Sequence, residues 1–221
     1  MRWPPVDRNA KLRRDATGRP APGVALFRMS VVPRSFPYDT GFAGAHMRAD
    51  EFLGMGETTE RYQLIEGPVM RTPRPTSRHQ AVIHNVMLQF APHLQRGLAV
   101  AYAEVDWQLD DDTVYSPDIA VYGASRSPGL PAALTTTPDL IIEVLSPGAG
   151  SFDLNETKDA YERAGLAEYW AIDPKDAGLR CSRRQEGLLV EIPFKGDTIV
   201  SAVLPGLTLH MEPLRELAAA D

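Results

Sequence analysis

Three charged residues stand in segments that are otherwise apolar, and together they could bind a cation and activate water. Asp118 begins the run 118–122, Glu143 interrupts the run 140–145, and Lys158 follows in an amphipathic segment. An unpaired buried charge costs several kcal/mol, so each of these groups needs a partner. Two carboxylates and a lysine that meet in one place can hold a divalent cation and activate water.

The period of a β-strand predicts which way Glu143 points. Ile141, Glu143 and Leu145 share one face of their strand. Asp118 opens its own strand after Pro117, which supplies no donor to a ladder. If the two strands are neighbours, Asp118 and Glu143 can share a cation, because adjacent carboxylates do not both stay ionised without one. Hard oxygen ligands favour Mg²⁺, with Mn²⁺ as a substitute, and the backbone carbonyl of Leu145 suits the same cations.

The segment after this strand predicts the helix that carries the lysine, and Gly165 ends that helix. Leu154, Lys158 and Tyr161 are four and three residues apart, so they share one helix face. That face should pack against the sheet, which turns Lys158 inward. An inward lysine needs an acid, and Glu143 lies on the strand just before. The sequence therefore predicts that Lys158 meets the two carboxylates.

The remaining patterns predict the elements of a mixed sheet. We expect a short helix from 48, a hairpin over 62–70 that turns at Glu66–Gly67, a helix capped by Ser77 and running to about 95, strands over 98–109, 114–122, 140–145 and 168–173, a final hairpin near 179–193, and a last helix over 211–220. This order indicates an α/β or α+β single domain in which helices flank a mixed β-sheet.

Composition separates the first 46 residues from the rest. Residues 1–46 hold six prolines, scattered arginines and no periodic apolar pattern, which predicts a disordered tail or a start codon placed before a true start at Met47. Residues 47–221 form the predicted domain. Residues 1–48 carry a net charge of +6 and residues 49–221 carry −12. An acidic domain argues against tight, non-specific polyanion binding, although a bound cation and a few arginines can offset the field locally.

Several other classes of protein receive little support. The longest apolar runs are too short for a membrane span, no secretory h-region follows the N-terminus, and the single Cys181 fits a reducing cytoplasm, so we expect a cytoplasmic protein. Gly148-Ala149-Gly150 follows a strand as a dinucleotide loop does. Asp153 stands where the third glycine belongs, however, and its carboxylate would repel a pyrophosphate.

A set of motifs resembles one family of proteins. The motifs are Pro117-Asp118, Glu143-Val144-Leu145-Ser146-Pro147, Asp153, Lys158, Tyr161, Gly165 and the run from Glu168 to Pro174. Together they resemble the Uma2 family of restriction endonucleases, within the PD-(D/E)XK nuclease superfamily. The resemblance implies a restriction-endonuclease-like fold, Mg²⁺-dependent hydrolysis of DNA phosphodiester bonds, and, by analogy with relatives that pair to cut both strands, a homodimer.

The resemblance also implies residue roles. Asp118 and Glu143 would be the metal ligands. The superfamily lysine, expected two residues after the glutamate, is replaced by Leu145, and Lys158 would take its place by orienting water and stabilising charge on the phosphate. Glu66 and His79 are candidates for accessory roles, against the simpler interpretations of a turn residue and a helix-start residue.

Two other functions remain open on the sequence alone. An inactive member of the same fold could bind nucleic acid or act as a scaffold, which the acidic composition would suit. The same metal site could also hydrolyse a phosphodiester other than DNA. Tyr161 and Trp170 are interpreted as core residues rather than platforms for stacked bases, and Asp153 as a helix cap rather than a ligand.

Overall fold

The computed structural model describes residues 41–56, 58–146 and 151–220, except for the side chains of 151–154. The elements, in chain order, are α1 (Ala49–Leu53), β1 (Arg61–Leu64), β2 (Val69–Thr72), α2 (Ser77–Gln95), β3 (Ala99–Ala103), β4 (Trp107–Gln108), β5 (Val114–Tyr115), β6 (Ile119–Gly123), η1 (Ala124–Arg126), β7 (Leu140–Val144), α3 (Ser151–Arg163), β8 (Glu168–Asp173), β9 (Gly178–Gln185), β10 (Leu188–Ile192), β11 (Thr198–Val200), β12 (Thr208–His210) and α4 (Glu212–Ala219).

A six-stranded mixed sheet is the centre of the domain. Its strand order is β10-β9-β8-β7-β6-β3. Strands β7 and β8 are parallel, and the other neighbouring pairs are antiparallel. A parallel pair needs a long crossover, which α3 provides here. The mixed sheet flanked by helices that the sequence predicted is therefore confirmed.

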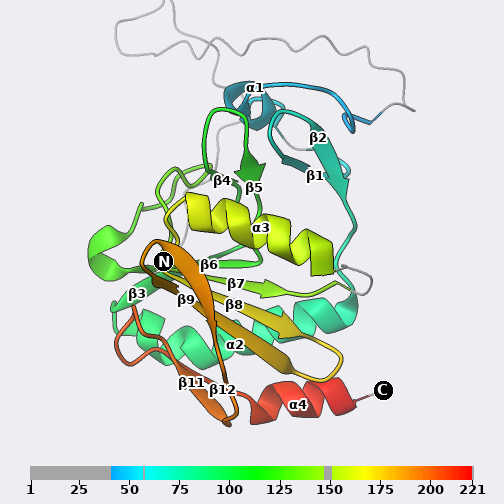
Figure 1. Cartoon of the computed structure of the whole chain (residues 1–221). Helices are drawn as coiled ribbons and strands as arrows, with labels where there is room; N and C mark the ends of the chain where they lie inside the picture. The colour runs from blue at the N-terminus through cyan, green and yellow to red at the C-terminus, as the bar shows by residue number, and fades with distance from the viewer. Residues whose placement is uncertain (1–40, 57, 147–150, 221) are drawn as a thin grey trace, which may run out of the picture. The chain divides into compact units, whose positions relative to one another are not determined.

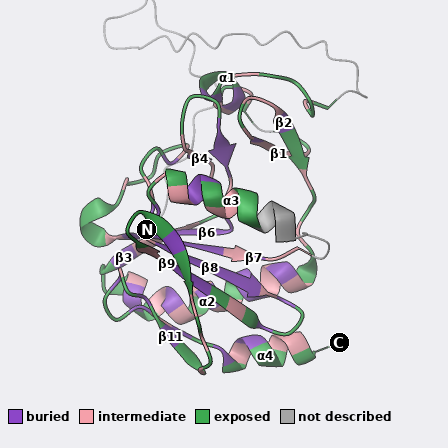
Figure 2. Ribbon diagram, in the orientation of Figure 1, coloured by how far each residue is buried: buried purple, intermediate pink, exposed green. Residues whose placement is uncertain are grey.

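Helices cover both faces of this sheet (Figure 1). On one face, α2 packs against α4, β3 and β7 over an aliphatic core that includes Ile142 and Trp170. On the other face, α3 closes a core that is rich in aromatic residues and includes Tyr122, Ile141 and Tyr161. The alternation Ile141-Ile142 thus sends successive side chains into different cores, as strand geometry requires. Figure 2 shows the central strands β6 and β8 largely buried between these layers.

A second, four-stranded sheet has the order β2-β1-β5-β4 and packs with α1 around its own small core. The predicted hairpin is confirmed: β1 and β2 pair from Arg61–Thr72 to Leu64–Val69. Its turn places Glu66 at φ 54° and Gly67 at φ 102°. Residues 41–46, assigned to the tail from the sequence, pair with this sheet, since the Val69 N–H donates to the carbonyl of Ala45 at 2.8 Å. The rest of the expected tail lies outside the described residues.

Two predicted strands are each broken into two. The segment 98–109 divides into β3 and β4, and 114–122 divides into β5 and β6, with one part in each sheet. Glu104 adopts φ 52° between β3 and β4, and Pro117, which has no N–H to donate, lies between β5 and β6. The chain therefore passes between the sheets at these points. A smaller correction concerns α2, whose N-cap is Thr76 rather than Ser77.

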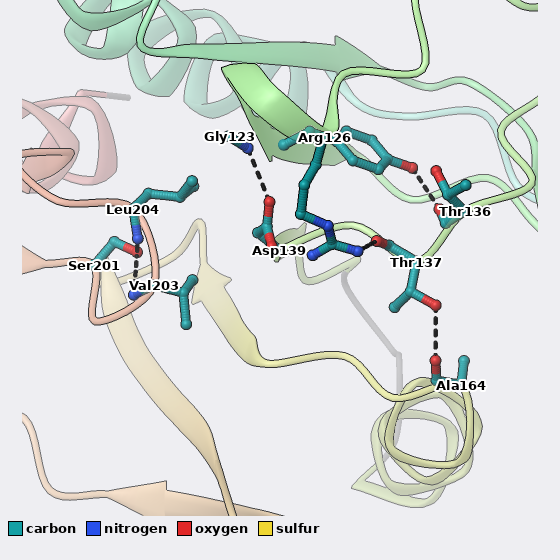
Figure 3. A network of polar contacts seen from close by, with 10 residues as sticks. Gly123, Arg126, Thr136, Thr137, Asp139, Ala164, Ser201, Val203 and Leu204 are labelled. Carbon is teal, nitrogen blue, oxygen red and sulfur yellow. Dashed lines mark hydrogen bonds and ion pairs between the residues drawn. The ribbon is translucent and has the colours of Figure 1, made fainter.

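The connection between β6 and β7 is tied down at both ends. The Asp139 carboxylate accepts the Gly123 N–H at 2.8 Å and pairs with Arg126 (Figure 3). The Thr137 hydroxyl donates to the carbonyl of Ala164 at the end of α3, at 2.8 Å. These contacts hold the loop that sets the register of β6 against β7. That register in turn determines which side chains meet at the candidate site.

Candidate active site

Asp118 and Glu143 lie beside each other, as the sequence predicted. Ile119 of β6 pairs with Ile142 of β7, so the residue before Ile119 faces the residue after Ile142. The Asp118 N–H donates to Oε2 of Glu143 at 3.4 Å, which is the long end of hydrogen bonding. The break after Pro117 leaves this N–H outside the β6 ladder and available to the carboxylate.

The Asp118 carboxylate is fixed by two further partners. Its Oδ2 accepts the Val144 N–H at 2.7 Å and lies 3.1 Å from Nε2 of His79. Asp118 is 7% exposed and His79 is 4% exposed. Burial lowers the pKa of His79, but the hydrogen bond to Asp118 and the charge of Asp118 outweigh it, so that the pKa is raised overall. His79 is therefore a direct partner of Asp118, positioned by the first turn of α2.

Glu143 is held in a different environment. Burial, followed by the charge of Asp118, raises the pKa of Glu143 well above its usual value, and the hydrogen bonds from Tyr161 and from the Asp118 N–H oppose that rise. Two neighbouring carboxylates in a low-dielectric site share either a proton or a cation. The pair is thus poised to exchange a proton for a metal ion.

An aromatic cluster supports Glu143 from the side of α3. The Tyr161 hydroxyl donates to Oε1 of Glu143 at 2.6 Å. The Tyr161 ring packs against Trp107, Tyr115 and Tyr169, with ring centroids 5.4, 5.5 and 5.8 Å away. Tyr161 is a core residue, as the sequence indicated, but its hydroxyl also reaches the site. Sequence reasoning missed that second role, although the helical spacing already placed Tyr161 on the face toward the sheet.

These groups open into a pocket of about 570 Å³ between the two sheets and α3. Its charged and titratable lining residues are Arg61, Arg71, His79, Tyr115, Asp118, Glu143, Glu156, Tyr161 and Tyr169. The arginines come from the β1–β2 hairpin and the two central carboxylates from the large sheet. The pocket therefore has two arginines on the side of the hairpin and two carboxylates on the side of the large sheet.

The structure does not bring Lys158 to the two carboxylates. Lys158 is half-buried, but it is not among the described residues that line the pocket. Its charge instead contributes to lowering the pKa of Glu191 on β10, after the larger effect of Arg180. The expected contact with Glu143 is made by Tyr161, one turn further along α3. Helix α3 packs against β10 and, through Tyr161, also reaches β7, and the charge of Lys158 acts on the β10 side.

Of the other predicted residues, Leu145 lines the pocket and Glu66 does not. The Leu145 N–H donates to the carbonyl of Ile172 at 2.8 Å. The Glu66 side chain is 72% exposed and pairs with Arg163 at 3.3 Å, away from Asp118 and Glu143. The side chain of Asp153 lies outside the described residues.

The donor set fits a hard divalent cation. Asp118 and Glu143 contribute neighbouring carboxylates, and Leu145 lines the same pocket. Within the part of the chain that the structure describes, no group of three or more His, Cys, Asp or Glu side chains is arranged as a metal cluster. A site built on two carboxylates plus a carbonyl resembles the sparse protein ligation of Mg²⁺, which keeps several waters.

Comparisons with known proteins agree with this fold. The structure is similar to the crystal structure of a "putative nuclease belonging to DUF820" from Anabaena variabilis, with a TM-score of 0.67 and 24% sequence identity over 78% of this chain and 99% of that chain. At that identity, the likeness concerns the fold. No curated protein matches the chain. Among the helices described, none is long and apolar enough to cross a membrane. Residues 49–212 match the Uma2 family, described as "Putative restriction endonuclease", and the chain belongs to that family.

Proposed function

We propose that this nuclease-family protein is a Mg²⁺-dependent endonuclease that hydrolyses phosphodiester bonds of DNA. The observation that carries the proposal is the pairing of Asp118 with Glu143 in a pocket, with a Glu143 pKa raised by burial and by its neighbour. Such a pair is the oxygen-rich, cation-seeking centre that phosphodiester hydrolysis requires. Membership of the Uma2 family supports the reaction class.

In the proposed reaction, the oxygen of a water attacks phosphorus, and the bond from phosphorus to the leaving sugar oxygen breaks. The attacking water loses a proton to solvent, and the leaving oxygen gains one. Asp118, Glu143 and the carbonyl of Leu145 would hold the cation, which when bound would supply positive charge to the phosphate and lower the pKa of a water. Val144 and His79 keep the Asp118 carboxylate in a single orientation, so it needs no rearrangement on binding.

The arginines of the hairpin favour a polyanionic substrate. Arg61 and Arg71 line the same pocket as the two carboxylates. They are paired at 2.9 Å with Glu104 and Glu60, respectively, and the Arg71 side chain is 62% exposed. An exposed ion pair is worth little, so a phosphate can compete for the guanidinium group of Arg71. The wall that the two arginines form would hold the DNA backbone beside the cation.

Lys158 keeps a proposed role on the phosphate rather than on Glu143. It lies next to Thr157, which lines the pocket, and its charge acts on Glu191 through space. A lysine with four rotatable side-chain bonds can turn toward a phosphate bound near this edge of the pocket. In that position it would stabilise the negative charge that develops during hydrolysis.

Cleavage of duplex DNA in the presence of Mg²⁺ or Mn²⁺ tests the proposal. Asp118→Ala should abolish cleavage while the protein still folds, as measured by circular dichroism and thermal unfolding. Asp159→Asn, which removes an exposed carboxylate on α3, is the matched control and should cleave like the wild type. Cleavage that is equal in wild type, Asp118→Ala and Asp159→Asn would reject this site. Single-stranded DNA, RNA and small phosphodiesters, tested in parallel, decide the substrate.

A further inference from the structure

The hydroxyl of Tyr169 is a hydrogen-bond donor without a partner beside the two carboxylates. Tyr169 lies on β8 and pairs in register with Ile141, so its side chain emerges on the same sheet face as Ile141 and Glu143. It is 4% exposed and lines the pocket. Among the described residues, its hydroxyl has no hydrogen-bond partner. Native proteins seldom leave a buried hydroxyl in this state, because it loses its water without compensation.

Two other buried polar atoms lack partners in the described part of the chain, and neither is equivalent. Nε1 of Trp170 lies in the aliphatic core on the opposite sheet face. Nδ1 of His79 belongs to a ring that already contacts Asp118 through Nε2. The Tyr169 side chain, by contrast, forms no hydrogen bond to a described residue. The Tyr169 hydroxyl is therefore a fully buried polar atom of this pocket whose side chain forms no other hydrogen bond to a described residue.

The electrostatics show what kind of partner Tyr169 can take. Burial, then the charges of Glu143 and Asp118, raise the pKa of Tyr169 far above its usual value. The phenol consequently stays protonated, so it can donate a hydrogen bond but cannot act as a base. Both carboxylates influence it without forming a hydrogen bond to it. A small acceptor between the phenol and the carboxylates would satisfy all three groups.

Three other candidate side chains do not supply a free hydrogen-bond donor to the pocket. Tyr161 is already engaged by Glu143, and its ring packs edge-on against that of Tyr169, at 5.8 Å and 70°, which fixes both phenols. Leu145 stands two residues after Glu143 and carries no donor on its side chain. Lys158 does not line the pocket. We propose that Tyr169 is a catalytic residue whose phenol donates a hydrogen bond to the water that attacks the phosphodiester, an inference that rests on the proposed nuclease function.

Tyr169 forms no covalent bond and transfers no proton in this step. The phenol keeps its proton, and the attacking oxygen, once its own proton has passed to solvent, has a further lone pair for attack on phosphorus. A donor that is already buried and oriented in the free protein needs no reorganisation when the substrate binds. The contribution of Tyr169 is therefore expected in kcat rather than in KM.

Two tyrosine-to-phenylalanine variants test the inference against a purely structural role. Tyr169→Phe should lower kcat for DNA cleavage by about 10–100-fold, the usual effect of removing a supporting hydrogen bond at a metal site, with KM, Mn²⁺ affinity and the urea unfolding midpoint unchanged. Tyr122 is the matched control, because it lies in the same core and donates to the carbonyl of Thr136 at 2.7 Å, outside the pocket lining. Tyr122→Phe should be less stable and should cleave at the wild-type rate. Wild-type kcat in Tyr169→Phe, or a loss matched by weaker folding or weaker Mn²⁺ binding, would overturn the inference.

A high-resolution crystal structure of the wild type supplies a readout that does not depend on cleavage. It should show an ordered water within about 3 Å of the Tyr169 hydroxyl oxygen that also contacts Glu143 or Asp118, and this water should be lost in Tyr169→Phe. A hydroxyl without such a water would refute the inference even if the protein cleaves DNA. If the water is present and wild type cleaves no phosphodiester with Mg²⁺ or Mn²⁺, the proposed nuclease function and the catalytic role both fail, and only the water site stands.

Discussion

The Tyr161 hydroxyl donates a 2.6 Å hydrogen bond to Oε1 of Glu143, which joins α3 to the acidic centre on β7. Tyr161 is 1% exposed, and its ring lies among Trp107, Tyr115 and Tyr169. The contact orients the carboxylate whose other oxygen accepts the Asp118 N–H. A helix on one side of the sheet thereby orients a carboxylate that a strand presents.

Tyr161→Phe should destabilise the protein by about 1–2 kcal/mol, because Glu143 loses a partner inside the fold while the ring packing is kept. The hydrogen bond from Tyr161 also opposes the rise in the Glu143 pKa, so the variant should bind Mg²⁺ more weakly at neutral pH. Urea unfolding and calorimetric titration with Mg²⁺ measure the two effects. Unchanged values in both experiments would show that this contact has no energetic importance.

The stability of the metal-free protein should fall as the pH rises above the usual glutamate pKa of 4.5. The pKa of Glu143 is raised in the folded state, so over this window the folded protein keeps a proton that the unfolded chain has lost, and the free energy of unfolding decreases with pH. Glu143→Gln cannot titrate and removes this component. Urea unfolding in EDTA should show that the free energy of unfolding of wild type, relative to that of Glu143→Gln, falls as the pH is raised from about 5. A difference that is constant with pH would contradict the burial of Glu143.

Lys158→Met should reduce DNA cleavage by at least about 10-fold if the ammonium stabilises charge on the phosphate, and should leave Mg²⁺ affinity unchanged. Methionine keeps most of the length of the side chain and removes the ammonium group. Lys175→Met, which changes an exposed lysine after β8, is the control for loss of a positive charge. Steady-state cleavage rates compare the three proteins. Equal rates in the two variants would remove Lys158 from the mechanism.

Arg71→Ala should weaken DNA binding and flatten its dependence on salt. Each phosphate contact that is lost lowers the slope of log K against log salt concentration by about 0.9 for duplex DNA. Arg215→Ala is a suitable control, because Arg215 lies on α4 and pairs with Asp197, whereas Arg71 lines the pocket. Fluorescence anisotropy of a labelled duplex in EDTA separates binding from cleavage. Identical slopes in both variants would place the DNA elsewhere.

The sequence predicted that Asp118 and Glu143 meet only on the condition that their strands are neighbours. Each carboxylate stands in an apolar segment, so the cost of burial predicted that each needs a partner, but the pairing of β6 with β7 comes from the structure. The direction of Lys158 could not be predicted, because the stripe that it shares with Tyr161 faces two different strands, β7 and β10. Only the strand order decides which strand each side chain meets.

Two further features could not be predicted without the sheet topology: the division of two predicted strands, and the contact of His79 with Asp118. Local periodicity shows that 114–122 is extended, but it does not show that Val114–Tyr115 belongs to a different sheet from Ile119–Gly123. His79 could be placed near a helix start from the sequence. Its partner comes from a strand distant along the chain, and no spacing rule connects the two.

Diffraction from crystals soaked with Mn²⁺, collected at the manganese absorption edge, tests the central claim most directly. The anomalous difference map should show one peak in contact with the carboxylates of both Asp118 and Glu143, at an oxygen–metal distance of about 2.2 Å. The same experiment on Asp118→Ala should show no peak. A wild-type map without a peak at these two side chains, or with a peak bound elsewhere, would contradict the account.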